Sequence, residues 1–109
     1  MRDDTAARKA LFWQLADALL VAGAATRGTM MGFPCLRADG RFFASVEPRT
    51  GELIVKLPSA RVLALIQEGI GQPFAPNGRV FREWVAVSQA DPKQWSQLLA
   101  EAQEFAANG

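Results

Sequence analysis

The N-terminal part of the chain spaces its apolar residues as a helix does. Leu11, Leu15 and Leu19 recur at every fourth position, so they share one face of an α-helix. Thr5 can cap the beginning of this helix. Gly23 can end it, because glycine tolerates the left-handed backbone that often follows a helix. We therefore expect an amphipathic first helix between these two residues.

The pattern then changes to an alternation of apolar and polar positions with period two. Strands are predicted at residues 29–37, 41–47 and 52–57. Asp39-Gly40 separates the first two and is a strong hairpin signal, because the turn needs positive φ and glycine has no Cβ to clash. These segments predict an antiparallel meander of three strands.

A second helix follows the meander. It is expected to begin at Pro58 and Ser59 and to stop at Gly69. Residues 71–78 contain two prolines and two glycines, which indicates a loop, with room for a very short strand around Phe74.

The last part of the chain predicts one more strand and a closing helix. The strand covers residues 80–87. Asp91 is a suitable N-cap for the helix, and Pro92 fits its first turn. The predicted order is helix, three strands, helix, one or two strands, helix. This order indicates a single α+β domain over residues 1–109, with two layers and the helices on one face of an antiparallel sheet.

Strand parity indicates which side chains meet the helices. In strand 41–47, Phe42 and Ala44 are expected to face the core, whereas Phe43 shares the opposite face with Arg41. By the same rule Ile54 faces outward in the next strand.

The stretch T-M-M-G-F-P-C-L, residues 29–36, is expected to present apolar side chains outward. Pro34 cannot donate to a sheet ladder, so this segment should be an edge strand or carry a bulge. Apolar side chains on an edge strand favour aggregation unless another surface covers them. We therefore predict an interface, with a second copy or another protein, formed by Met31, Phe33, Cys35, Phe43 and Ile54.

Two alternatives stay open for strand 80–87. If Val85 and Val87 face the core, Glu83 becomes a half-buried carboxylate that needs a cationic partner, and Trp84 lies outside beside Lys56. If Trp84 faces the core instead, the assignment is reversed.

The titratable residues narrow the possible chemistry. The chain has no histidine and one cysteine, which excludes an internal disulfide, zinc sites built on imidazole or several thiolates, and catalytic pairs that use histidine. Cys35 is expected to be a packing residue. Glu83 is the one candidate for an acid or base in the less favoured reading of the chain as a small enzyme.

The net charge of +1 is far from that of a dedicated nucleic-acid binder, but the middle of the chain is mildly basic. An ordinary solvated surface is the simplest interpretation of these basic residues. The alternative is that the Asp39-Gly40 hairpin acts as a wing whose arginines contact phosphates. The candidate nucleic-acid contacts are Arg27, Arg37, Arg41, Lys56, Arg79 and Arg82.

Several stretches together resemble known families. R-G-T-M-M-G-F-P-C-L-R-A-D-G-R-F-F-A-S-V (residues 27–46) and E-L-I-V-K-L (residues 52–57) resemble the TfoX N-terminal domain. P-F-A-P-N-G-R-V-F-R-E-W-V-A-V (residues 73–87), with D-P-K-Q-W (residues 91–95), is similar to the related MmcQ/YjbR-like proteins. The resemblance implies a secretion-chaperone-like order of α-β-β-β-α-β-β-α. The resemblance implies fold more than activity: in TfoX the domain belongs to a regulator of competence genes, and YjbR-like members are often described as DNA-binding proteins.

We therefore expect a non-enzymatic, regulatory domain that acts through protein contact, as a homodimer or with a partner. Weak DNA binding through the basic hairpin is the alternative. No cofactor, metal or small-molecule substrate is expected. Gln14 and Asp17 interrupt the apolar run of the first helix, which favours a cytoplasmic protein over a signal peptide or a membrane span.

Overall fold

The computed structural model describes residues 4–30 and 32–108 and has the predicted α+β architecture. Six strands form one antiparallel sheet in the order β1-β2-β3-β4-β6-β5. The elements along the chain are α1 (Thr5–Val21), β1 (Thr26–Met30), β2 (Phe33–Ala38), β3 (Arg41–Val46), β4 (Leu53–Lys56), α2 (Ser59–Gln67), β5 (Gln72–Phe74), β6 (Phe81–Val87) and α3 (Pro92–Asn108).

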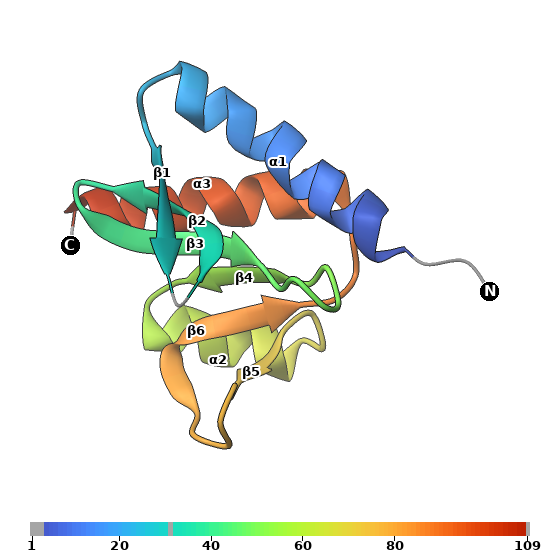
Figure 1. Ribbon diagram of the computed structural model, residues 1–109. Helices are drawn as coiled ribbons and strands as arrows, with labels where there is room; N and C mark the ends of the chain where they lie inside the picture. Colours follow the sequence, from blue (N-terminus) through green and yellow to red (C-terminus); the bar gives the residue numbers. More distant parts are fainter. Residues whose placement is uncertain (1–3, 31, 109) are drawn as a thin grey trace.

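The helices cover one face of the sheet and form the second layer (Figure 1). α3 packs across β2, β3 and β4, at the centre. α1 packs against α3 and β3, whereas α2 covers β6 and β5 at the other end of the sheet. None of the helices in the described part of the chain has the length and apolar character needed to cross a bilayer.

Local signals define the element ends as expected at several points. Asp39 and Gly40 both have positive φ, 55° and 79°, in the turn between β2 and β3. Gly23 and Gly69, with φ of 74° and 78°, follow α1 and α2. Asp91 caps α3, because its Oδ1 accepts hydrogen bonds from the backbone N–H groups of Lys93 and Gln94 at 3.0 and 3.4 Å.

The prediction of one strand over residues 29–37 is wrong, because this segment contains a hairpin. β1 pairs with β2 from Thr26–Arg37 to Met30–Phe33, and Gly32, with φ of 89°, lies in the connection. The residues on both sides of Gly32 are apolar, so the pattern of apolar and polar positions does not indicate a turn there. The meander therefore has four strands, and β2, which carries Pro34, lies inside the sheet while β1 forms the edge.

A bulge between β2 and β3 overturns the expected parity of β3. Leu36 pairs with Ala44, but Arg37 pairs with Phe42, so Phe43 is an extra residue in β3. Phe43 and Ala44 are both fully buried in the core cluster. The prediction of Phe42 inward and Phe43 outward is therefore wrong.

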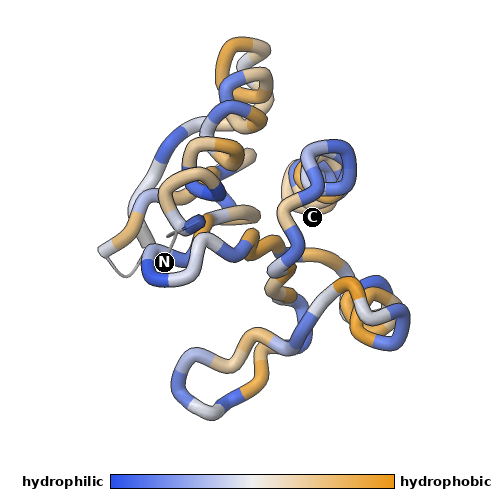
Figure 2. Tube along the Cα trace, turned by 90° about the vertical axis from the view of Figure 1, so that its right-hand side faces the viewer, coloured by the Kyte–Doolittle hydropathy of each residue, from blue (hydrophilic) through white to orange (hydrophobic). Residues whose placement is uncertain are grey.

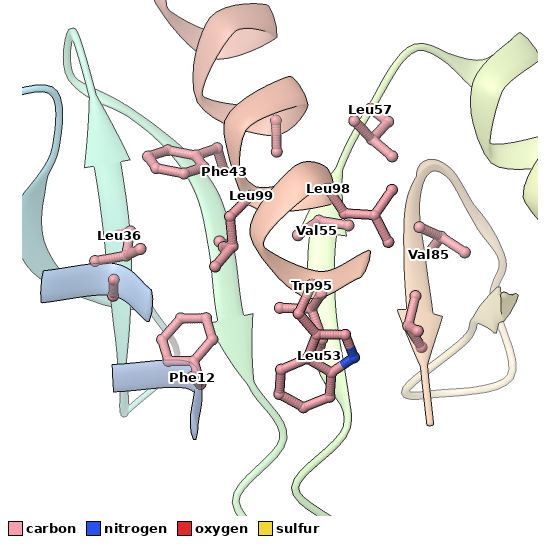
Figure 3. Packing of buried hydrophobic residues seen from close by; sticks show 14 of the residues in the cluster. Phe12, Leu36, Phe43, Leu53, Val55, Leu57, Val85, Trp95, Leu98 and Leu99 are labelled. Atoms are coloured by element: carbon pink, nitrogen blue, oxygen red, sulfur yellow. The ribbon is translucent and has the colours of Figure 1, made fainter. Parts of the chain in front are cut away.

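The centre of the core lies between α3 and the sheet. Trp95, Leu98 and Leu99 of α3 lie over β3 and β4 (Figure 3). The Trp95 indole Nε1 donates to the carbonyl oxygen of Gln89 at 2.8 Å, so the buried ring has no unsatisfied donor.

The core-facing residues of β6 are Val85 and Val87, which are fully buried. Trp84 pairs with Lys56 and is half-buried. Glu83 is exposed, although its carbonyl oxygen accepts a hydrogen bond from the Leu57 N–H at 2.9 Å. The alternative in which Val85 and Val87 face the core is therefore confirmed, but its expectation of a half-buried Glu83 carboxylate is wrong.

Candidate protein-binding surface

Three exposed large apolar side chains gather at one end of the molecule. Four such residues are exposed in the described part: Val21 (80%), Val80 (57%), Leu63 (56%) and Phe81 (42%). Val21 is alone at the end of α1. The other three line one groove of about 370 Å³ between α2 and β6. We call this the α2–β6 groove; its main apolar lining residues are Leu63, Ile66, Pro73, Val80, Phe81 and Trp84.

One wall of the groove is α2. Val62 and Leu65 of this helix are buried against the sheet. Leu63 follows Val62 by about 100° around the helix axis, so it points away from the sheet and into the groove. Burial of only one side of α2 therefore leaves a second apolar edge of the same helix in contact with water.

The opposite wall comes from an irregular pairing of β5 and β6. Pro73 pairs with Val85, but the next residue, Phe74, pairs with Phe81. Residues 82–84 of β6 therefore have no partner in β5. The irregularity brings the Phe74 ring to 6.0 Å from that of Phe81 and 6.3 Å from that of Trp84, which forms an aromatic cluster beside the groove.

Gly71 allows the chain between α2 and β5 to run close to β6. A Cβ atom at this position would lie 2.5 Å from Val85 Cγ2 and 3.4 Å from Leu65 Cβ. Glycine therefore permits the close approach that sets the spacing between α2 and the sheet at this end.

The polar and charged groups around the groove favour a negatively charged binding partner. Arg82 contributes to the lining, and Arg79 is exposed in the loop before β6. Within residues 4–30 and 32–108 neither arginine forms an ion pair. Ser59 and Ala60, at the N-terminal and electropositive end of α2, also line the groove, and Pro58 gives this end no side-chain cap.

A second groove, of about 500 Å³, lies on the sheet face opposite the helices. Phe33, Ile54, Phe74 and Ala86 line it, and Glu47, Arg49 and Glu52 lie at its border. It shares Pro73 with the α2–β6 groove, so apolar surface continues around the short edge strand β5. The loop between β5 and β6 forms the lowest part of Figure 2, with a hydrophilic tip followed by a hydrophobic stretch.

The interface predicted from the sequence is only partly present on this outer groove. Phe33 is half-buried at its wall, and Ile54 lines it with 4% of its surface exposed. Cys35 is fully buried, and Phe43 belongs to the core on the other face, so neither can form a contact surface. Met31 lies outside the described residues. Burial raises the pKa of the Cys35 thiol, although Arg37 opposes this effect, and the side chain is therefore a neutral packing group.

The predicted nucleic-acid contacts do not form one surface. The Arg27 guanidinium lies 4.3 Å from the centre of the Trp13 ring, and that of Arg37 lies 5.7 Å from the Phe42 ring. Arg37 also packs against Gly28, where a Cβ atom would lie 2.8 Å from its Nε. Both arginines therefore use their planar groups in contacts within the fold.

Arg41 lies on the helix face of the β2–β3 hairpin, opposite Arg37. Its Nη1 donates to the Ala106 carbonyl oxygen at 3.1 Å and lies 3.6 Å from Asp39 Oδ2. Arg41 and Lys56 share a hollow of about 340 Å³ with Glu83 near the C-terminal end of α3. Arg82 lies instead in the lining of the α2–β6 groove, and Arg79 lies in the adjoining loop. The hairpin therefore does not present Arg37 and Arg41 together, as a wing that contacts phosphates would require.

The sequence reasoning did not identify the α2–β6 groove. The available signal is the pair of consecutive apolar residues Val80-Phe81, because an alternating half-buried strand would expose one of them. Leu63 beside Val62 is a similar signal in α2. In the part of the chain that the structure describes, no three His, Cys, Asp or Glu side chains lie close enough together to hold a metal ion.

Comparison of the chain with protein-family models, curated proteins and solved structures gives no match. The resemblance to TfoX N-terminal domains therefore stays a prediction from the quoted motifs.

Proposed function

We propose that this chain is a non-enzymatic domain that binds another protein chain through the α2–β6 groove. The observation that carries the proposal is the convergence of Leu63, Val80 and Phe81 on one concave site. Exposed apolar residues scattered singly over a surface need no explanation, whereas exposed apolar residues gathered in a groove are typical of a recognition site.

Burial of this surface can contribute a measurable part of the binding energy. Each of the three side chains is about half exposed. Full burial of one large apolar side chain contributes about 1.5–3 kcal/mol, so completing the burial of all three contributes roughly 3 kcal/mol. This corresponds to about a hundredfold in affinity, before the aromatic contacts of Trp84 and Phe74 are added.

Nucleic-acid binding has less support in the geometry. The six basic residues lie on at least three separate parts of the molecule, and Arg27, Arg37 and Arg41 already make contacts within the fold. A phosphate-binding surface needs several cations that follow the backbone of one strand.

Site-specific photocross-linking tests the proposal. A benzophenone amino acid at position 81 or 63 should give adducts with a protein partner in cells of the source organism, and the same group at position 21 should not. Val21 is the matched control, because it is also apolar and exposed but lies outside the groove. Excess wild-type protein should suppress the adducts, and excess Phe81→Ser should not. Equal adduct patterns from positions 81 and 21 would contradict the proposal.

A further inference from the structure

We infer that the α2–β6 groove binds an amphipathic helix of a different protein, one whose apolar face is bordered by aspartate or glutamate. The inference rests on the proposed function and specifies the chemistry and conformation of the partner.

The charge at the groove is complementary to that of an acidic partner. The groove has an apolar floor, and the charged side chain in its lining is Arg82, with Arg79 in the adjoining loop. The electropositive N-terminal end of α2 lies at the same groove, through Ser59 and Ala60. Carboxylates on a partner would meet all three sources of positive potential, and lysines would be repelled by them.

The edge strand β5 is a poor template for the backbone of a partner in strand conformation. The free edge of β5 is three residues long and has proline at its centre, so it offers few donors and acceptors to an added strand. A partner at this site therefore binds mainly through side chains that enter the groove, and backbone hydrogen bonds to β5 contribute little. An amphipathic helix presents its side chains in this way, with anchors at i, i+3 or i+4, and i+7.

A second copy of the chain is a less suitable occupant in a two-fold contact. A two-fold contact places the same surface on both sides of the interface. It would bring Arg79 and Arg82 of each copy against a groove that carries the same arginines. Like charges at such a contact oppose association, so a partner with a different sequence is favoured.

The test uses two synthetic, fluorescein-labelled peptides of about fifteen residues, each with leucines at the anchor positions of one helical face. They differ only in that the residues bordering the leucines are glutamates in one and lysines in the other. Fluorescence anisotropy measures affinity, and amide chemical shifts of the labelled protein locate the site. The acidic peptide should bind at least about tenfold more tightly at low salt, should shift amides of α2 and β6, and should lose this advantage near 0.5 M salt.

Charge reversal supplies the matched comparison. Arg79→Glu with Arg82→Glu should invert the preference between the peptides. Lys9→Glu with Lys93→Glu changes the net charge equally, away from the groove, and should leave the preference unchanged. Phe81→Ser should weaken both peptides.

Three results would overturn the inference: equal affinities for the two peptides, equal effects of the two charge reversals, or no amide shifts at α2 and β6 with either peptide. These outcomes are separate from failure of the proposed function, which the cross-linking at positions 81 and 21 decides without any peptide.

Discussion

The two ends of the sheet are covered to different degrees. On the side of β2, β3 and β4, which we call the α3 end, α3 is supported by α1, and its Trp95, Leu98 and Leu99 are all buried. At the other end the shorter α2 covers β5 and β6 alone. It buries Val62 and Leu65 but leaves Leu63 exposed beside Val80 and Phe81. The α3 end is built for stability, and the α2 end keeps apolar surface for contact.

The largest expected effect is at the α3 end. Trp95→Ala removes the largest fully buried side chain and leaves its cavity in the core, so we expect a loss of about 3–5 kcal/mol in the free energy of unfolding. Urea denaturation measures it. The control at the other end is Leu63→Ala, which should cost less than about 1 kcal/mol, because half of that side chain is already in water. Similar losses for the two variants would remove the distinction between the ends.

The next effect tests the spacing of α2 from the sheet. Gly71→Ala places a methyl group 2.5 Å from Val85 Cγ2, and we expect a cost of about 1–3 kcal/mol from overpacking. Denaturation of Gly71→Ala, Val85→Ala and the double variant forms a cycle. If the contact is the cause, the double variant should lose clearly less stability than the sum of the single losses. Additive losses would show that the glycine acts in another way.

A smaller effect is expected where the two ends are joined by an ion pair. Arg61 of α2 donates two hydrogen bonds to Glu101 of α3, from Nε at 2.9 Å and from Nη2 at 3.2 Å. The pair is partly exposed, so Arg61→Ala should cost about 0.5–1 kcal/mol, with Glu101→Gln as the comparison variant.

The same pair gives a prediction for pH. The hydrogen bond to Glu101 raises the pKa of Arg61 above its already high ordinary value. A raised pKa in the folded state gives stability that is complete below the unfolded pKa and is lost only as pH rises through the folded one. The arginine therefore contributes no change between pH 6 and 9, and the cost of Arg61→Ala should be equal at these two values. A cost that falls over this range would contradict the assignment.

A similar small effect is expected at the C-terminal end of α3. Arg41→Met keeps most of the side-chain length but removes the hydrogen bond to the Ala106 carbonyl oxygen. We expect a loss of about 1 kcal/mol or less. Hydrogen exchange should rise in the last turn of α3 and stay constant in α2. A uniform rise in both helices would mean that Arg41 does more than cap this end.

The smallest effect on stability is expected in the groove. Phe81→Ser removes an apolar side chain that is 42% exposed, so the melting temperature should change little, while binding of a partner or of the acidic peptide should be lost. Val21→Ser is the control for both measurements. A large fall in stability would place Phe81 among the residues that hold the fold.

The fold class could be predicted from the sequence because turn and capping residues define the ends of helices and strands through contacts with their near neighbours in the chain. Asp39 and Gly40 adopt the positive φ values that the hairpin turn requires, and Asp91 caps α3. The errors arose where backbone geometry interrupts a regular pattern. Gly32 turns the chain inside an unbroken apolar run, and the extra residue Phe43 reverses the faces of β3 from that point toward the hairpin. Neither event changes the composition or the period of the neighbouring residues.

The candidate site was harder to predict for a different reason. Exposure of Leu63, Val80 and Phe81 depends on how far α2 extends over the sheet, which is a property of packing between distant elements. The prediction of an outward patch around Cys35 also depends on strand parity alone. A face without helices can still bury its residues under neighbouring side chains, as Cys35 and Ile54 illustrate.

The three tryptophans lie in three different surroundings, and this gives the molecule its own optical reporters. Trp95 is enclosed in the core, Trp13 lies under the guanidinium of Arg27, and Trp84 is half-buried at the groove. Emission from Trp84 should move to shorter wavelength when a ligand excludes water from the groove, whereas that of Trp95 should stay constant until the chain unfolds. A variant with Phe at positions 13 and 95 would leave Trp84 as the single emitting tryptophan, so that occupancy of the groove could be followed in solution without any label.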